Sequence, residues 1–390
     1  MKIILILLSI FLTLFSFSGS GLSITYGDFL SFIIFIIFVH DFLKGRLKFN
    51  LYSKIWFSFL FLMFFTSVVN ITLTEGRFMN IFKTNIFSLI YFVYVYSIIT
   101  TKKSQLKYII YGLPTLAILF LVKTWPEMQK AWANSSSDFT NVEIFESSLN
   151  LNTWGYILVL FFIFSMYCWV SKIYSKLSIA FSFLFLVFLF FSYSRTAYTL
   201  IGFILFWVIF YVNKTNVKRL ILPAASIVLL FIFKDSLNVF NFQVTDAALE
   251  FYEKKSSTYS DDLVDTRFYL INIVPIYESF SKFNFFQILI GDGVSVQHSF
   301  VSHNLIVFGI FGLFLYLKRF IITIKYCLKK INNNNNVIAP KFIILILVVI
   351  LINDFVTNVS NFLPFASYLS SVILGFFYAN MKNSQTENEK

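Results

Sequence analysis

An arginine with the setting of an anion-binding group stands at position 195. It lies in the segment Ser-Tyr-Ser-Arg-Thr-Ala, residues 192–197, between two apolar stretches that are long enough to cross a membrane. The connection is so short that the guanidinium must lie at or just below the membrane surface, where a charge is costly. A helix begins directly after it, so exposed N–H groups and the positive dipole end would join the arginine in binding phosphate. The alternative is an arginine that extends to lipid headgroups.

A histidine at the start of a later apolar stretch has the setting of a general base. His303 lies in the segment Val-Ser-His-Asn-Leu, residues 301–305. In the first turn of a helix the positive dipole end favours a neutral imidazole, which can accept a proton. Gly309 and Gly312 follow at a spacing of three, which predicts a helix face that another helix can approach closely. The alternative is a histidine that hydrogen-bonds across the helix bundle.

A second arginine, Arg267, gives a weaker signal. Asp265 or Thr266 could cap a helix whose first turn presents it. An arginine in a loop is as often a solvated charge, here with Asp262 as its partner. The chain has no metalloprotease, nucleophile-elbow or P-loop motif and no cluster of His and Cys. We therefore expect no metal and no other cofactor.

The composition shows what kind of scaffold must position these side chains. Hydrophobic residues make up 58 % of the 390 residues, charged residues only 13 %, and the mean hydropathy is +0.78. A soluble globular chain is nearer half apolar and a quarter charged. The two cysteines, Cys168 and Cys327, exclude a disulfide scaffold and a C-x-x-C zinc site. The sequence therefore predicts an all-α integral membrane protein.

Apolar stretches of about 17–25 residues each predict membrane-spanning helices. The chain has twelve of them, at 2–19, 26–43, 55–73, 81–100, 107–124, 151–170, 177–193, 196–213, 217–233, 300–324, 341–360 and 364–381. We interpret the first as a retained helix rather than a signal peptide, because it is long and no Ala-x-Ala site follows it. The whole chain, 1–390, is expected to form a single transmembrane domain.

The charges predict the orientation of these spans. With the N-terminus in the cytoplasm, 21 of the 31 Lys and Arg residues but only 3 of the 19 Asp and Glu residues lie on the cytoplasmic side. This asymmetry is what the positive-inside rule describes, and twelve spans also place the C-terminus inside. The net charge of +12 therefore reports topology and contact with anionic lipid, and no nucleic-acid partner is expected.

One loop on the outer side is large enough to form a cap. It covers residues 234–299, and within it 246–255 and 265–282 predict short amphipathic helices, followed by a turn at 290–293. A second outer loop covers about 125–150. After the last span, residues 382–390 are polar and predict a flexible cytoplasmic tail. A site is expected on the outer face, because loops on a rigid scaffold carry function.

The ordered motifs resemble the O-antigen ligase/polymerase superfamily. The resemblance is carried by the Ser-x-Ser-Arg-Thr-Ala step with Ser194, by an arginine in the large outer loop, and by His303-Asn304-Leu followed by the Gly-x-x-Gly helix. It implies a metal-independent C-type glycosyltransferase fold with a periplasmic cap loop in the bacterial inner membrane. It also implies a donor and an acceptor that are oligosaccharides linked to undecaprenyl pyrophosphate.

The resemblance also implies roles for the residues. Arg195 and Arg267 would bind the donor pyrophosphate and neutralise it as the bond to the sugar breaks. His303 would take the proton from the acceptor hydroxyl, with Ser194, Asn304, Gly309 and Gly312 in support. Aromatic residues of the outer loops would either stack on sugars or anchor the chain at the interface; they are Trp125, Trp132, Tyr252, Tyr259 and Tyr269.

Several activities share these features. We expect a polymerase that joins repeat units, for which a chain-length regulator protein would be a further partner. A ligase that transfers glycan to a lipid A core, or another glycosyltransferase of the family, would use the same residues. A lipid-linked sugar flippase is the alternative from a different class. A transporter should show related halves and polar or broken helices near the midplane, and the sequence suggests neither; Asn353 and Asp354 come nearest.

Overall fold

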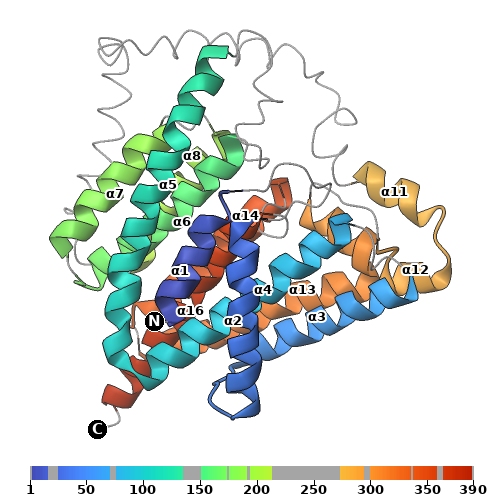
Figure 1. The fold of residues 1–390 in the computed structure, drawn as a ribbon, viewed down its shortest axis with the longest axis horizontal. Coiled ribbons are helices and arrows are strands. Elements are labelled where there is room, and N and C mark those ends of the chain that lie inside the picture. Colours follow the sequence, from blue (N-terminus) through green and yellow to red (C-terminus); the bar gives the residue numbers. More distant parts are fainter. Residues whose placement is uncertain are drawn as a thin grey trace. The chain divides into compact units, whose positions relative to one another are not determined.

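The structure is a computed structural model in which the described chain is helical (Figure 1). It describes residues 2–15, 25–70, 76–134, 151–173, 175–190, 194–212, 273–293, 299–334, 337–357 and 363–388. No β-strand occurs within these ranges, so the prediction of an all-α protein is confirmed for them. The chain divides into two compact units: Met1–Gly112 together with Asp261–Lys390, and Leu113–Ser260.

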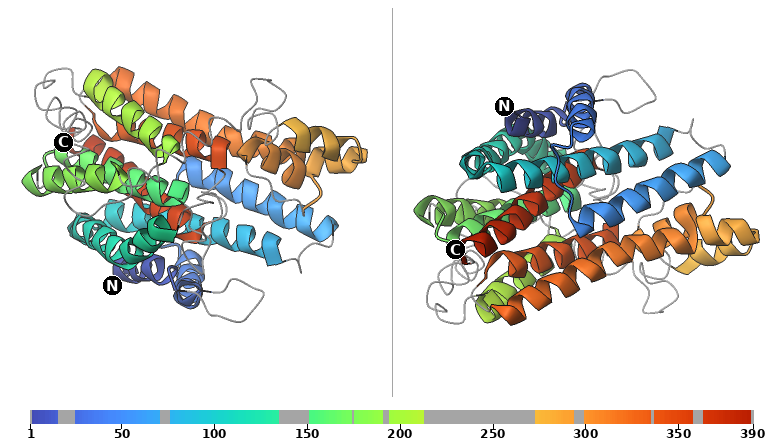
Figure 2. Two further views of the ribbon diagram at one scale, coloured as in Figure 1. Left: turned by 90° about the horizontal axis from the view of Figure 1, so that it is seen from above. Right: turned by 90° about the horizontal axis from the view of Figure 1, so that it is seen from below.

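The first unit contains most of the helices. In chain order they are α1 (Lys2–Leu12), α2 (Tyr26–Leu43), α3 (Leu51–Val69), α4 (Gly76–Thr101), the 3₁₀ turn η1 (Lys103–Gln105), the start of α5 (Leu106–Asn134), α11 (Val274–Phe280), α12 (Phe285–Ile290), α13 (Phe300–Asn333), α14 (Ala339–Thr357) and α16 (Pro364–Asn388). Its centre is the pair α4 and α16, which lie side by side (Figure 2). Gly375 makes this close approach possible, because a Cβ there would lie 2.8 Å from the carbonyl oxygen of Phe92.

The second unit contains the rest of α5, followed by α6 (Leu151–Val170), α7 (Ser175–Phe190), α8 (Arg195–Trp207) and the π-helical turn η2 (Val208–Val212). Buried polar pairs join its helices. The Trp154 indole donates to the Thr124 hydroxyl at 2.8 Å, between α6 and α5. The hydroxyls of Ser165 and Ser182 are 2.8 Å apart, between α6 and α7. These bonds satisfy groups that would be costly to leave unpaired among apolar side chains.

The helices are those of a multi-pass membrane protein. Among the described residues, six helices are long and apolar enough to cross a membrane: Tyr26–Leu43, Leu51–Val69, Met79–Thr101, Lys103–Pro126, Thr153–Val170 and Val301–Asn333. Eleven of the twelve predicted stretches coincide with helices, although α1 is shorter than predicted and ends at Leu12. The remaining stretch, 217–233, lies outside the described residues, and the total of twelve crossings stays a prediction.

Two carboxylates in the first unit, one buried and one partly buried, are paired with cations. Asp41, near the end of α2, is 3 % exposed; Lys2 of α1 donates to it, and so does the Tyr94 hydroxyl of α4, at 3.0 Å. Asp28, in the first turn of α2, accepts from the Lys83 ammonium at 2.9 Å. Pairing of this kind is the general condition for charges inside a helix bundle in a membrane. The two pairs connect α1, α2 and α4 near their ends.

The long helix α13 is broken at Gly309. The glycine has φ 65° and ψ −168°, a conformation outside the helical region, so the segment 300–308 and the segment 310–333 are separate pieces. The prediction that Gly309 and Gly312 share one face of a continuous helix is therefore wrong. A close approach does occur at Gly309, and its partner is the C-terminal end of the short helix α12, at Leu289 and Ile290.

Hydrogen bonds from the turn after α12 hold the break in place. The N–H groups of Asp292 and Gly293 donate to the carbonyls of Ile306 at 2.9 Å and Val307 at 3.1 Å. A Cβ at Gly291 would lie 2.2 Å from the Val307 carbonyl, and a Cβ at Gly309 would lie 2.3 Å from the Leu289 carbonyl. Two backbones therefore meet where only glycine fits. The turn predicted at 290–293 occupies only 291–293, because Ile290 is the last residue of α12, a short helix that was not predicted.

Two polar side chains of α3 tie the same turn to the bundle. The Thr66 hydroxyl donates to the carbonyl of Ile290 at 2.9 Å, and the Asn70 amide donates to the carbonyl of Gly291 at 3.2 Å. These carbonyls end α12 and have no partner within that helix. Of the two helices predicted in the large loop, α11 lies within 265–282, and 246–255 lies outside the described residues.

We expect Gly309→Ala to lower the stability of the protein much more than Gly45→Ala. Both glycines have positive φ, 65° and 64°, which costs an alanine about 1–3 kcal/mol. Only Gly309 also faces a backbone, because nothing lies within 4 Å of a Cβ at Gly45. Thermal unfolding in detergent measures both. Equal losses in the two variants would show that the contact with the end of α12 does not hold the break.

Candidate functional site

His303 lies in the first turn of α13, as its sequence context predicts. Ser299 caps this helix: its hydroxyl accepts from the N–H of Val301 at 3.3 Å, and its carbonyl accepts from the N–H of His303 at 2.8 Å. The Ser302 hydroxyl donates to the same carbonyl at 3.2 Å. The imidazole is 1 % exposed and meets the Phe308 ring edge to face, with 5.6 Å between centroids. A serine-rich cap therefore fixes the position of this histidine.

The break in α13 lies a turn and a half beyond His303. Asn304 is 1 % exposed and belongs to the same short segment. A Cβ at Gly312 would lie 2.1 Å from the Cβ of Phe308 and 3.4 Å from the carbonyl oxygen of Asn304. Gly312 thus leaves room for the short segment to pack against the long one. The prediction was that Gly312 allows a neighbouring helix to come close. In the structure it instead allows the two pieces of α13 to pack on each other.

Arg195 is the first residue of α8. The Ser194 hydroxyl caps this helix by accepting from the N–H of Ala197 at 3.2 Å, and the Ser194 carbonyl accepts from the N–H of Tyr198 at 3.0 Å. The prediction that a helix begins directly at the arginine is confirmed. The free N–H groups of such a first turn, together with an arginine, suit an anion.

The three predicted catalytic residues do not lie within one described unit of the protein. His303 belongs to the first unit and Arg195 to the second, and Arg267 lies outside the described residues. Their convergence stays a prediction. Of the aromatic residues predicted to contact sugars or the interface, Trp125 packs edge to face on Phe188 with centroids 5.0 Å apart. The other four predicted aromatic residues have side chains that the structure does not describe; they are Trp132, Tyr252, Tyr259 and Tyr269.

A buried arginine that the sequence analysis did not select lies in the middle of the first unit. Arg319 of α13 is 5 % exposed, and its guanidinium carbon lies 4.5–5.4 Å from the centres of four aromatic rings. We call these five residues the Arg319 cage; the rings are those of Tyr52, Trp56, Tyr316 and Phe320. Faces of electron-rich rings stabilise a cation that has lost its water.

A carboxylate supplies the opposite charge beside the cage. Asp354 of α14 is 0 % exposed and accepts a hydrogen bond from the Tyr316 hydroxyl at 2.8 Å. Tyr316 therefore touches the cation with its ring and the anion with its hydroxyl. The ring of Phe59 joins this cluster to the histidine, since it packs on Phe308 at 5.6 Å and on Tyr316 at 6.0 Å. His303 and the Arg319 cage thus belong to one continuous aromatic core.

A pattern in the sequence could have revealed the cage. Tyr52 and Trp56 are four apart, and so are Tyr316 and Phe320, so each pair presents two rings on one helix face. Arg319 stands between the second pair. It lies within the predicted span 300–324, where it was counted only as one of the 21 basic residues of the cytoplasmic side. The helix α13 continues to Asn333, nine residues beyond the predicted end of that span.

Comparison with known proteins finds no match for the chain, whether among family models, curated proteins or solved structures. Within the described ranges, no group of three His, Cys, Asp or Glu side chains could hold a metal ion. The capped His303, the break at Gly309 and the Arg319 cage are therefore the features from which a function is inferred.

We expect strong energetic coupling between Arg319 and Asp354. Arg319→Met leaves a buried carboxylate without its cation, and Asp354→Asn leaves the cation without its carboxylate, so each costs about 3–5 kcal/mol. The double variant removes both charges and should lose less than the two single losses combined, by about 1 kcal/mol or more. Denaturant unfolding in detergent gives the free energy of unfolding of the wild type, the two single variants and the double variant.

Arg319→Lys serves as the control for shape in the same series. It keeps the charge but not the planar group that can lie flat on Trp56. We expect an intermediate loss of stability. Strict additivity of the two single losses would contradict the coupling, and an unchanged Arg319→Lys protein would contradict the importance of stacking.

Proposed function

We propose that this chain is a membrane glycosyltransferase that joins repeat units carried on undecaprenyl pyrophosphate, as its resemblance to the O-antigen ligase/polymerase superfamily implies. The observation that carries the proposal is the setting of His303. This histidine stands in the first turn of a helix, fixed by Ser299 and buried against Phe308. The long apolar helices support a site that works on a membrane-anchored substrate. The periplasmic face of the inner membrane is the proposed location.

The reaction assigns one task to each residue. His303 accepts the proton of an acceptor sugar hydroxyl, whose oxygen then bonds to the anomeric carbon of the donor. The bond from that carbon to the pyrophosphate oxygen breaks, and the lipid pyrophosphate leaves. Arg195, at the N-terminus of α8, and Arg267 neutralise the charge that develops on it. Stabilisation of a leaving group by fixed cations is usually the largest contribution in such a site.

Burial places a condition on this mechanism. Since the imidazole is 1 % exposed, a sugar hydroxyl reaches it only after substrate binding uncovers it. The break at Gly309 favours such a change, because the segment 300–308 is not continuous with the long segment of α13. Exclusion of water from the closed site would protect the donor from hydrolysis.

A lipid-linked glycan transporter is the second candidate, and two observations favour it. Transporters place their sites at broken helices and carry charged residues inside the bundle. The sequence suggested no such feature, yet α13 is broken at Gly309, and Arg319 and Asp354 are buried between α3, α13 and α14. A transporter would depend on this charged pair for turnover, whereas a glycosyltransferase would depend on His303.

Replacement of His303 tests the proposal. In a strain that lacks this gene but keeps its surface-glycan genes, we expect wild type to restore a ladder of long glycans and His303→Gln to fail. Loss of a general base lowers the rate by about 10²–10⁴-fold. The glycans are separated on a gel, and the membrane level of each variant is measured with an epitope tag.

His40→Gln is the matched control, because His40 is exposed near the end of α2. It should restore the ladder fully. A null strain with single repeat units on its lipid A core would support a polymerase, and bare core with long glycan retained on the lipid carrier would identify a ligase. A null strain with no glycan outside the inner membrane, or full activity of His303→Gln, would overturn the proposal and favour the transporter.

A further inference from the structure

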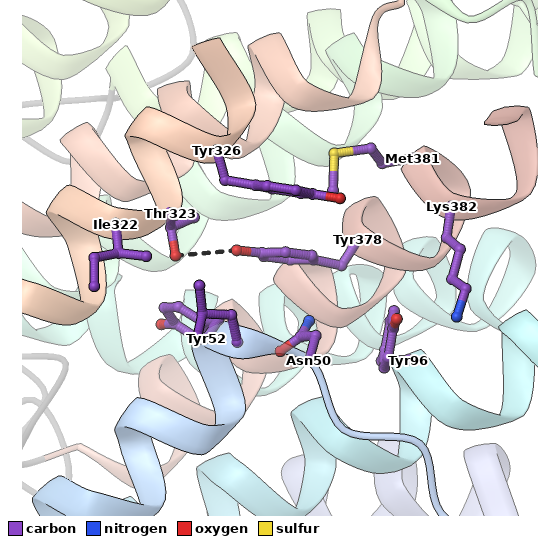
Figure 3. Close-up of a pocket in the computed structure, with 10 residues that line it drawn as sticks. Asn50, Tyr52, Tyr96, Ile322, Thr323, Tyr326, Tyr378, Met381 and Lys382 are labelled. Carbon is purple, nitrogen blue, oxygen red and sulfur yellow. Dashed lines mark hydrogen bonds between the residues drawn. The ribbon is translucent and has the colours of Figure 1, made fainter. Parts of the chain in front are cut away.

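A cavity of about 280 Å³ lies between α3, α4, α13 and α16 of the first unit (Figure 3). It is far from His303 along α13, near the opposite end of that helix. Its lining includes four tyrosines, Tyr52, Tyr96, Tyr326 and Tyr378, together with Asn50, Thr323 and Lys382. Nothing in the proposed reaction uses them. We call this space the α3–α16 cavity.

Aromatic rings form the walls of the cavity. Figure 3 shows the ring of Tyr326 above that of Tyr378, and Tyr52 and Tyr96 below Tyr378. The Tyr378 hydroxyl donates to the Thr323 hydroxyl at 3.1 Å, which holds that ring in place. Tyr52 also belongs to the Arg319 cage. The walls thus combine flat apolar faces with hydroxyl groups, a lining that suits a small amphipathic group.

The polar groups of the cavity are suited to an anion. The Lys382 ammonium lies 6.0 Å from the centre of the Tyr96 ring, and the Lys330 ammonium lies 5.5 Å from the centre of the Tyr326 ring, so a cation stands beside two of the walls. None of the described residues that line the cavity is acidic. The Asn50 side chain caps α3 through its oxygen, which accepts from the N–H of Ser53 at 2.9 Å. Its amide nitrogen is buried and has no hydrogen-bond partner among the described residues, which leaves a donor available.

The residues around the cavity carry the charge that suits a position at the level of lipid headgroups. The cavity lies where α3 begins and α4 ends, and exposed basic residues are gathered there; they are Lys44, Arg46, Lys48, Lys102 and Lys329. The positive-inside rule assigns such an end to the cytoplasmic leaflet, where anionic lipids are available. Basic pockets between membrane helices on that side bind lipid headgroups.

We propose that the α3–α16 cavity binds the headgroup of an anionic glycerophospholipid. The phosphodiester accepts hydrogen bonds from the Lys382 ammonium and the Asn50 amide, and the glycerol portion packs between the tyrosine rings. The volume of about 280 Å³ lies just below the usual range of ligand pockets, about 300–1,000 Å³, so it admits a headgroup while the acyl chains remain outside in the bilayer. This site is independent of the proposed glycosyl transfer. Its ligand would connect the end of α16 to the start of α3.

Binding is tested on the purified full chain in a neutral detergent. The probes are short-chain phosphatidylglycerol, short-chain phosphatidylcholine, glycerol phosphate and inorganic phosphate, added in a thermal-unfolding assay and in native mass spectrometry. A ligand that binds only the folded state raises the melting temperature as its concentration rises. We expect a saturable rise and retained lipid with phosphatidylglycerol and neither with the other three. Equal effects of phosphatidylcholine would show that charge is not recognised, and equal effects of either soluble phosphate would show a free-phosphate site; both overturn the proposal.

Two variants locate the binding within the cavity. Lys382→Gln removes the cation at an exposed position and should weaken phosphatidylglycerol binding by about tenfold, the effect of one charge-assisted hydrogen bond. Thr323→Leu should weaken it by narrowing the space without a change of charge. Lys54→Gln, an exposed lysine of α3 that does not line the cavity, is the matched control and should bind as wild type does. Equal losses in Lys382→Gln and Lys54→Gln would mean general attraction to anionic lipid and would overturn the site.

Discussion

A helix that is broken inside an apolar layer must have its freed backbone groups bonded by another part of the chain, because lipid supplies no partners. In α13 that part is the turn after α12, whose N–H groups reach the carbonyls of Ile306 and Val307. The two backbones come so close that Gly291 and Gly309 both have to lack a side chain. The Thr66 and Asn70 side chains then anchor the same turn to α3. The position of His303 depends on this arrangement, since the break separates its segment from the long part of the helix.

The same constraint governs the charged side chains of the first unit. Asp41 has Lys2 and Tyr94, and Asp28 has Lys83. Arg319 differs from these cations, because aromatic rings surround its guanidinium and no carboxylate among the described residues bonds to it directly. Asp354 accepts a hydrogen bond from Tyr316, whose ring contacts the guanidinium. A guanidinium tolerates this because it is weakly hydrated and flat, so aromatic faces replace part of its water. The charge pair is then separated but still linked through one tyrosine.

The sequence predicted most helices and little of what joins them. Apolar length alone located the segments that become α2, α6 and α14, since no other structure satisfies so long an apolar run. The first-turn positions of His303 and Arg195 were also predictable, because serines precede both and cap the helices. The break at Gly309 was not, since its cause is a turn about eighteen residues earlier in the chain. The Arg319 cage was missed because its rings come from α3 and α13, and local composition does not show that they meet.

The broken helix bears on both candidate functions in the same way. The segment 300–308 is hydrogen-bonded to the turn after α12, whereas the residues from 310 to 333 have their own contacts with α3 and α14, so a change in position of the segment would have to break only the first set of bonds. For a glycosyltransferase that change would expose the buried imidazole to a sugar hydroxyl. For a transporter it would open one end of the bundle while the Arg319 cage and Asp354 stay in place. The two functions therefore differ in the group that must contact the substrate. A glycosyltransferase needs His303, before the break, whereas a transporter needs Arg319 and Asp354, beyond it.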